Sequence, residues 1–484
     1  MSKILHFKTL VFLLLSLHVF SQSNDFFYAT VPADKAAELQ QLFPSEVDIL
    51  ATKNSQSAVY MSRFAAKELH QNVTTHGPGY VFMDSGEKAL QRLEMEILQS
   101  KSPAMAFTIT EDVMVQEGLN LINATNIEDH ILLLEGYGTR FHTKPTATIA
   151  IMDLKDKWEA MAATAGRTDV SVRIVDHVNT PMPSVVMTIE GAETPDEFVI
   201  IGGHADSTAN PNNDDAPGAD DDASGIATIT EVARALFELE YYPSKTIEFM
   251  AFAAEEIGLV GSGEIADEYN DNNINVIAFV QFDMTLYPGS AEDVFITTDS
   301  YNSNVLNDFL TDLMDHYNAS GPHQFTYSTT ACGYGCSDHY SWSQEGYETA
   351  FPFESDFSES NPFIHSPDDT YDFVGNPDHA KNFAKLGLEF LIEATKSAEL
   401  STEDFTEAAV GLFIRDKTVS FQLKNGATAL KNLSIFDVAG QKVVEKPVSG
   451  NKGTISLQQL AQGFYIARFT LANNRTIAKK FVLR

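Results

Sequence analysis

Three apolar, strand-like runs in the middle of this chain each end in residues that can bind a metal ion. His204 follows the first run, the pair Glu255 and Glu256 follows the second, and Asp283 follows the third. A single histidine after a strand is usually an ordinary loop residue, and a single glutamate pair is usually solvated surface. Because open α/β sheets gather ligands at the carboxyl ends of their strands, three such ends within about eighty residues indicate one shared site.

The region from about 113 to 397 alternates strand-like and helical patterns. It predicts an α/β domain whose central, mostly parallel sheet is covered by helices on both faces. The helices expected there span residues 147–165, 224–239 and 380–395, and the strands span 170–175, 184–189, 198–201, 246–254 and 276–282.

Length and charge divide the chain further. A chain of 484 residues is too long for one compact core, so two or three domains are expected. The net charge of −35 disfavours nucleic acid as a partner. Residues 401–484 hold 12 basic and 6 acidic residues, so this part carries +6 while the rest carries −41. The last segment, with its short strands and turns, predicts a separate C-terminal β-sandwich.

The N-terminus predicts export. Lys3 and Lys8 precede an apolar run at 9–17, which is the pattern of a signal peptide and is too short to be favoured as a membrane anchor. No other segment reaches eighteen apolar residues, so we expect no membrane span in the mature protein. Residues 22–112 predict a small α+β domain in which we identify no cluster of metal ligands; a pro-domain is the first interpretation and a permanent accessory domain the second.

The acidic residues around the predicted strand ends have different expected tasks. One aspartate is enough to cap the helix after residues 220–222, but three adjacent carboxylates repel one another unless a cation lies among them. Neighbouring side chains on an extended strand diverge, so Glu255 and Glu256 should differ, one binding metal and the other taking a proton. Asp206 lies two residues after His204 and can accept its ring N–H; an Asx-turn is the alternative.

This ligand set predicts a hydrolase with two metal ions. Two divalent ions about 3.5–4 Å apart can stabilise both the attacking and the departing oxygen, and a bound zinc lowers the pKa of its water to about 7. Mixed imidazole and carboxylate ligands favour zinc over magnesium or calcium, with cobalt or manganese as substitutes.

The spaced motifs resemble those of the secreted bacterial leucyl aminopeptidases, a family of co-catalytic zinc exopeptidases. The resemblance implies two zinc ions per catalytic domain, peptide substrates with a free N-terminus, and a monomer. Glu255 would be the general base and later the acid, and Asp206 the partner of the His204 ring. The matching segments are 203–207, 217–225, 253–259, 281–285, 332–339 and 364–365. The implied ligands are His204 and Asp283 for one ion, Glu256 and His365 for the other, and Asp221 shared between them.

The same resemblance implies a pocket for a large apolar N-terminal side chain such as leucine. Phe351 and Ser360 depart from residues that relatives can have there, which leaves the ranking of Leu, Phe and Met open. Cys332 and Cys336 are the only cysteines, and an oxidising compartment predicts a disulfide between them, which would hold part of the pocket. The implied pocket residues are Met284, Ile296, Tyr334, Phe351, Phe353, Phe357 and Ile364.

The two ends of the chain carry weaker resemblances. The N-terminal segment is similar to the inhibitory propeptide of the same enzymes. Residues 433–441, 463–467 and 479–483 look like the type IX secretion sorting domain of Bacteroidetes, which implies the secretion machinery as a partner and release or attachment outside the cell. The expected organisation is a signal peptide at 1–21, a propeptide at 22–112, a catalytic domain at 113–397 and a sorting domain at 405–484.

Two other functions compete with this interpretation. A single-zinc glutaminyl cyclase shares the fold and many ligands, but the aspartate run at 220–222 and the cysteine loop argue against it. A non-catalytic adhesin with a dead site is disfavoured by the intact pair Glu255 and Glu256.

Overall fold

The structure is a computed structural model of the whole chain, and it describes residues 25–72, 76–94, 107–396, 410–415, 417–423, 430–438, 440–450, 452–471 and 476–483. The chain divides into two compact units, residues 1–397 and 398–484. Each unit is described by itself below.

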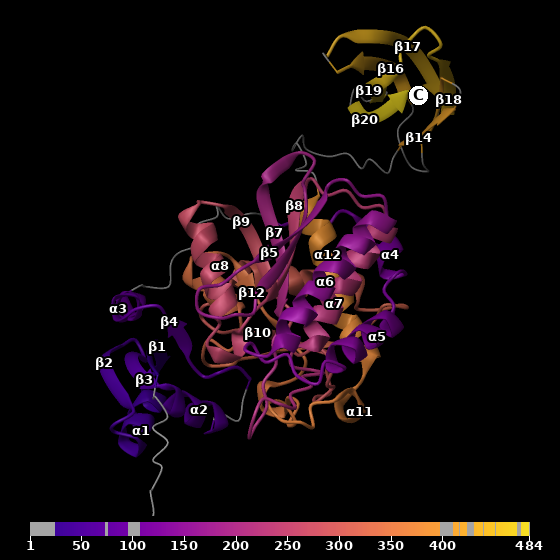
Figure 1. Cartoon of the computed structure of the whole chain (residues 1–484). Helices are drawn as coiled ribbons and strands as arrows, with labels where there is room; N and C mark the ends of the chain where they lie inside the picture. Colours follow the sequence, from indigo (N-terminus) through magenta and orange to yellow (C-terminus); the bar gives the residue numbers. More distant parts are fainter. Residues whose placement is uncertain are drawn as a thin grey trace, which may run out of the picture. The chain divides into compact units, whose positions relative to one another are not determined.

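A six-stranded mixed sheet forms the centre of the first unit (Figure 1). Its strand order is β12-β9-β7-β8-β6-β5, in which β12, β9, β7 and β8 run parallel while β6 and β5 are antiparallel to their neighbours. The strands are β5 (Val170–Val175), β6 (Ser184–Ile189), β7 (Thr194–His204), β8 (Lys245–Phe252), β9 (Asn275–Gln281) and β12 (Thr349–Ala350).

Helices cover both faces of this sheet because its strands are apolar on both sides. Every residue of β8 is buried, and its alternate side chains enter two different clusters. Ile247 and Phe249 face the larger cluster with α5 (Ala124–Glu135), α6 (Pro145–Thr164), α7 (Ala223–Glu238) and α12 (Pro377–Thr395). Met250 and Phe252 face the smaller cluster with α8 (Val260–Asp271) and α10 (His339–Gln344). Figure 1 shows α7 and α12 on one side of the sheet and α8 on the other.

A second, smaller sheet and further helices complete this domain. A second sheet has the order β11-β10-β13, with β11 parallel and β13 antiparallel to β10. The remaining elements are α4 (Asp112–Leu119), η1 (Glu255–Ile257), β10 (Val294–Thr297), α9 (Asn304–Tyr317), β11 (Tyr327–Thr330), β13 (Pro352–Phe353), η2 (Phe357–Glu359) and α11 (Tyr371–Val374).

The N-terminal part of the first unit is a small α+β domain with its own core. Its antiparallel sheet has the order β2-β3-β1-β4. Alternate residues of β1, such as Ala29 and Val31, are buried against apolar residues of the neighbouring helices. The elements are β1 (Phe26–Pro32), α1 (Ala33–Leu42), β2 (Val47–Lys53), β3 (Gln56–Ser62), α2 (Arg63–Asn72), β4 (Val81–Met83) and α3 (Gly86–Glu94).

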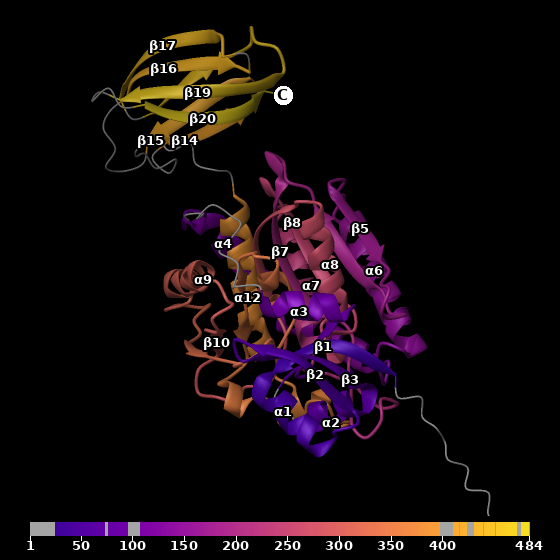
Figure 2. The same ribbon diagram turned by 90° about the vertical axis from the view of Figure 1, so that its left-hand side faces the viewer.

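The second unit is built from two antiparallel sheets, β14-β15-β18 and β17-β16-β19-β20 (Figure 2). Phe421 from one sheet and Phe469 from the other meet with ring centroids 5.4 Å apart, so the two sheets share a core. The strands are β14 (Val410–Arg415), β15 (Thr418–Leu423), β16 (Leu430–Asp437), β17 (Lys442–Gly450), β18 (Lys452–Ser456), β19 (Gly463–Leu471) and β20 (Thr476–Leu483).

The predicted fold class is confirmed: a central α/β domain, a small N-terminal α+β domain and C-terminal sheets. Within the described ranges, no helix combines the length and apolarity that crossing a membrane requires. The predicted signal peptide at 1–21 lies outside the described residues.

Candidate metal centre

The parallel register of three central strands brings the predicted ligands to one edge of the sheet. His204 at the end of β7 pairs with Phe252 at the end of β8, and Gly202 pairs with Gln281 at the end of β9. The chain therefore leaves all three strands at the same level, so His204, the glutamate pair and Asp283 emerge side by side.

Asp221 lies at the middle of the resulting cluster and faces two histidines with its two oxygens. Its Oδ1 is 2.9 Å from Nε2 of His204, and its Oδ2 is 3.1 Å from Nε2 of His365. Nε2 of His204 also lies 3.5 Å from Oδ1 of Asp283, while Nε2 of His365 lies 3.3 Å from Oε2 of Glu256. The five predicted ligands thus converge as two groups that share one carboxylate.

Donor atoms in this cluster are buried without hydrogen-bond partners among the described residues. Such atoms are costly unless a further group, water or an ion satisfies them. They are Nε2 of His204, both oxygens of Asp221, both oxygens of Glu256, Oδ1 of Asp283 and Nε2 of His365. Because imidazoles and carboxylates are typical ligands of zinc, the residues present fit divalent cations.

The electrostatics of the cluster also favour a cation. Burial would raise the pKa of Asp221, but His204 and His365, whose ring nitrogens face its two oxygens, outweigh it and hold that pKa well below its usual value. Burial would lower the pKa of His365, but Glu256 and Asp221 raise it to about 10. These opposite shifts show that the buried carboxylates favour positive charge at this place, which bound cations would supply.

The three adjacent aspartates have three different roles. Asp222 caps α7 by accepting the N–H of Gly225 at 2.8 Å, and it also accepts the N–H of His204 at 2.9 Å. Asp220 accepts the N–H of Leu286 at 3.0 Å. Only Asp221 presents both oxygens to the histidines. The helix cap is thus provided by Asp222, as one member of the run was expected to do, and Asp221 stays the predicted metal ligand.

Asp206 holds the turn that carries the glutamate pair. Its carboxylate accepts the N–H groups of Glu255 and Glu256 at 2.9 and 3.3 Å. The nearest acceptor for Nδ1 of His204 is the main-chain oxygen of Asp206 at 3.2 Å, and the carboxylate is 3.6 Å away. Asp206 therefore connects His204 to the glutamate pair: its main-chain oxygen faces the His204 ring, and its carboxylate binds the main-chain N–H groups of both glutamates.

Glu255 differs from Glu256 in its surroundings: Glu256 lies 3.3 Å from Nε2 of His365, whereas no ion pair of the described residues includes Glu255. Both of its carboxylate oxygens are buried and have no hydrogen-bond partner in the described part of the chain. Burial, and then the charge of Glu256, raise the pKa of Glu255 well above its usual value. A buried carboxylate with a raised pKa is suited to exchange a proton near neutral pH.

Most of the predicted pocket residues form one apolar cluster beside the metal centre. The cluster includes both cysteines, which are joined by the predicted disulfide. The rings of Phe351 and Phe353 lie 5.4 Å apart, and those of Phe353 and Phe357 lie 4.8 Å apart. Ile296 belongs instead to the main core. The predicted residues in the cluster are Met284, Tyr334, Phe351, Phe353, Phe357 and Ile364.

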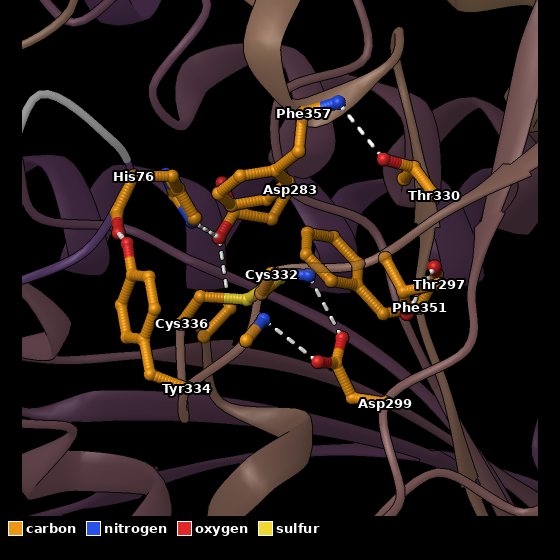
Figure 3. The surroundings of a disulfide bond; sticks show 12 residues. His76, Asp283, Thr297, Asp299, Thr330, Cys332, Tyr334, Cys336, Phe351 and Phe357 are labelled. Atoms are coloured by element: carbon orange, nitrogen blue, oxygen red, sulfur yellow. Dashed lines mark hydrogen bonds and ion pairs between the residues drawn. A yellow bond between two sulfur atoms is a disulfide. The ribbon is translucent and has the colours of Figure 1, made fainter. Parts of the chain in front are cut away.

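The structure adds two histidines from the N-terminal domain, where sequence analysis identified no ligand cluster. The segment has no cluster of its own, but it completes two groups with residues of the catalytic domain: His70 with Glu256 and His365, and His76 with His204 and Asp283. Figure 3 shows His76 beside Asp283, next to the disulfide and Phe351. The sequence feature that could have indicated them is a pair of histidines six positions apart, of which the second is followed by Gly-Pro-Gly.

Sequence analysis also gave no role to Ser337, which orients Asp283. Its hydroxyl donates to Oδ2 of Asp283 at 2.5 Å and accepts from Nε2 of Gln281 at 3.1 Å. Both ends of this short chain of hydrogen bonds lie at or after the end of β9, so the Asp283 side chain is fixed relative to the sheet.

Two family descriptions match separate parts of the chain. Residues 184–391, which contain all five predicted ligands, match peptidase family M28, and residues 416–484 match a secretion system C-terminal sorting domain. A sorting domain of this kind implies a protein that is secreted or displayed on the cell surface.

Individual relatives agree with the family match. The "Probable leucine aminopeptidase" of Trichophyton verrucosum is 31% identical over 335 residues, which are 68% of this chain and 88% of that protein. Leucine aminopeptidase 1 of Coccidioides posadasii is 32% identical over 57% of this chain and 72% of that protein. The crystal structure of the LapA aminopeptidase of Legionella pneumophila is 31% identical, with a TM-score of 0.68, and covers 78% of this chain and 100% of its own. The chain belongs to peptidase family M28, and is therefore a hydrolase of peptide bonds.

Proposed function

We propose that this protein is an exported leucyl aminopeptidase that removes N-terminal residues from peptides with two zinc ions. The observation that carries the proposal is the convergence of two ligand groups on Asp221, whose two oxygens lie 2.9 and 3.1 Å from two different histidines. A single-metal site has no need of a carboxylate placed between two imidazole-containing groups. The family and the relatives named above supply the reaction class.

Glu255 is the residue we assign to proton transfer. Two bound zinc ions would hold the free α-amine and the carbonyl of the substrate and would acidify a water molecule. Glu255 then takes the proton from the attacking water and later gives it to the leaving amine. We assign the task to Glu255 and not to Glu256 because Glu256 lies 3.3 Å from His365 in one of the two ligand groups, whereas no ion pair of the described residues includes Glu255.

The preference for large apolar N-terminal residues is proposed from the aromatic cluster. Phe351, Phe353 and Phe357 are buried beside the metal ligands, and the bridged loop at Cys332 and Cys336 packs against them. An apolar wall of this kind stabilises a leucine side chain by about 2 kcal/mol relative to water.

Export and processing complete the proposal. The sorting domain would engage the secretion machinery, and residues 22–112 would be removed from the catalytic domain at 113–397. We propose that the catalytic domain acts as a monomer, because the ligands and the pocket all come from one chain.

Replacing Glu255 by alanine tests the proton-transfer role. Turnover of leucine p-nitroanilide by the processed enzyme should fall by about 10²–10⁴-fold, while zinc content stays near that of the wild type. Exposed Glu238, at the end of α7, gives a matched control when it is replaced by alanine, and activity should not change. Near-normal turnover by Glu255→Ala would reject the assignment.

Metal analysis separates this function from the single-zinc alternative. We expect two zinc ions per chain and release of N-terminal leucine. One zinc per chain together with cyclisation of N-terminal glutamine would instead identify a glutaminyl cyclase.

A further inference from the structure

We propose that His70 and His76 are zinc ligands, and that each closes one of the two metal positions while the N-terminal domain is docked. The inference rests on the proposed two-zinc site and adds a mechanism of latency to it. We term His70 and His76 the closing histidines.

His70 reaches the group that contains Glu256 and His365. It lies in the last turn of α2, and its ring stacks on that of His365 with centroids 4.3 Å apart. Both of its ring nitrogens are buried and have no hydrogen-bond partner in the described residues. One donor atom each from His70, Glu256 and His365 lies within 4.8 Å of the others, a spacing at which one ion can contact all three.

His76 reaches the other group. Its side chain is completely buried, with Nε2 2.6 Å from Oδ2 of Asp283 and Nδ1 3.8 Å from Oδ2 of Asp221. The ring also lies beside the aromatic cluster of the proposed pocket, with its centroid 6.1 Å from that of Phe353. A side chain here occupies the place where an N-terminal residue would enter the site.

The backbone around His76 is held in place by the catalytic domain. The hydroxyl of Tyr334 donates to the main-chain oxygen of His76 (Figure 3). Gly77 follows with a φ of +77°, and a Cβ there would lie 2.5 Å from the main-chain oxygen of Cys336 and 3.5 Å from Oε1 of Glu255. The segment therefore passes directly over the disulfide loop and the proposed general base.

Wider contacts fix the N-terminal domain on the catalytic domain. The N–H of Phe82 donates to the oxygen of Gly258 at 3.0 Å, three residues after Glu255. The Nζ atom of Lys88 lies 2.9 Å from a carboxylate oxygen of Asp267, and that of Lys67 donates to the oxygen of Pro211 at 3.1 Å. These contacts hold α2 and the segment after it against the ligands.

The number of protein ligands at each metal ion would change when the N-terminal domain docks. The catalytic domain supplies three residues to each ion, counting Asp221 twice, which leaves one position of a tetrahedral site open. Catalytic zinc sites keep such a position for water or substrate, whereas structural sites fill all four with protein ligands. The closing histidines raise both sets to four, so the docked domain turns an open, catalytic geometry into a closed one.

Counting imidazoles by X-ray absorption spectroscopy of the zinc-loaded, full-length chain tests the proposal without using activity. Each ion should show an average of two imidazole ligands, one from each domain. Replacing both closing histidines by phenylalanine, which keeps the ring volume, should reduce the average to one. An average of one in the wild type would overturn the proposal.

The rate at which a chelator removes zinc gives an independent test. His70→Phe and His76→Phe should each accelerate release by about tenfold or more, since even weaker perturbations of a metal site change affinity by about 10–100-fold. Lys88→Ala is the matched control, because it loosens docking without removing a ligand, and release should change much less. Equal rates for wild type and both phenylalanine variants would show a purely steric plug and reject the ligand role.

The two proposals fail in different ways. Two zinc ions per chain with one imidazole each would overturn the closing histidines and leave the aminopeptidase proposal standing. A chain that binds no zinc would overturn both.

Discussion

The catalytic domain and the N-terminal domain each contribute imidazoles to one candidate metal centre, but they hold them by different means. His204 is the last residue of a central strand and is fixed by the register of the sheet. His70 and His76 belong to a domain with a separate core and depend on docking contacts for their position. If the N-terminal domain is removed as proposed, the site consists of a permanent part held by the central sheet and a removable part held by docking contacts.

Replacing Asp221 by alanine should have the largest effect on the permanent part. The change removes a ligand from both groups at once, so zinc affinity should fall by at least about 100-fold and activity should be lost. Zinc content after dialysis and turnover of leucine p-nitroanilide by the processed enzyme measure it. Asp215→Asn, in the same loop but exposed, is the control and should bind two ions. Normal zinc content in Asp221→Ala would contradict the shared-ligand geometry.

Replacing Gly77 by alanine should weaken the removable part. A non-glycine residue at this positive φ costs about 1–2 kcal/mol, and its Cβ would also press on the oxygen of Cys336. We expect the basal activity of the unprocessed chain to rise about tenfold, with unchanged zinc content. Gly138→Ala has a similar φ of +70° but no neighbour within 4 Å, so it controls for backbone strain alone. Equal activity in both variants would argue against a tight docking contact at Gly77.

Removing the disulfide should have the smallest effect and should act on the pocket. Replacing Cys332 and Cys336 by serine removes a bridge that spans only four positions, so the loss of stability should be about 2 kcal/mol or less. The Michaelis constant of the processed enzyme for leucine p-nitroanilide should rise about threefold. The Michaelis constant for alanine p-nitroanilide should change less, because the alanine side chain does not fill the pocket. A similar rise for both substrates would show that the loop does not shape selectivity.

Local sequence patterns were sufficient for the catalytic fold. The strands 170–175 and 184–189 appear with the predicted bounds as β5 and β6, and the helix predicted at 224–239 is α7 at Ala223–Glu238. These elements are readable because the apolar residues that form the core recur with the period of a strand or a helix. The same patterns located His204 and Asp283, because the end of each apolar run predicts where a strand of the parallel sheet ends.

The parts that the sequence did not reveal depend on contacts between distant segments. His70 lies in a helical pattern typical of a surface helix, and the residues that it groups with, Glu256 and His365, are far from it along the chain. Ile296 was expected in the pocket but lies in the main core, because the side on which a strand residue packs depends on the neighbouring sheet. Ser337 acquires its role only where the loop after the disulfide meets β9.

By itself, the sequence determined the α/β domain, the C-terminal module and the ligand types at the strand ends, because hydrophobic period and strand polarity are local properties. Only the tertiary structure decided that a second domain places two more imidazoles at the same centre. Docking joins surfaces that are more than a hundred residues apart in the chain. Neither surface has a periodic sequence pattern from which the other could be predicted.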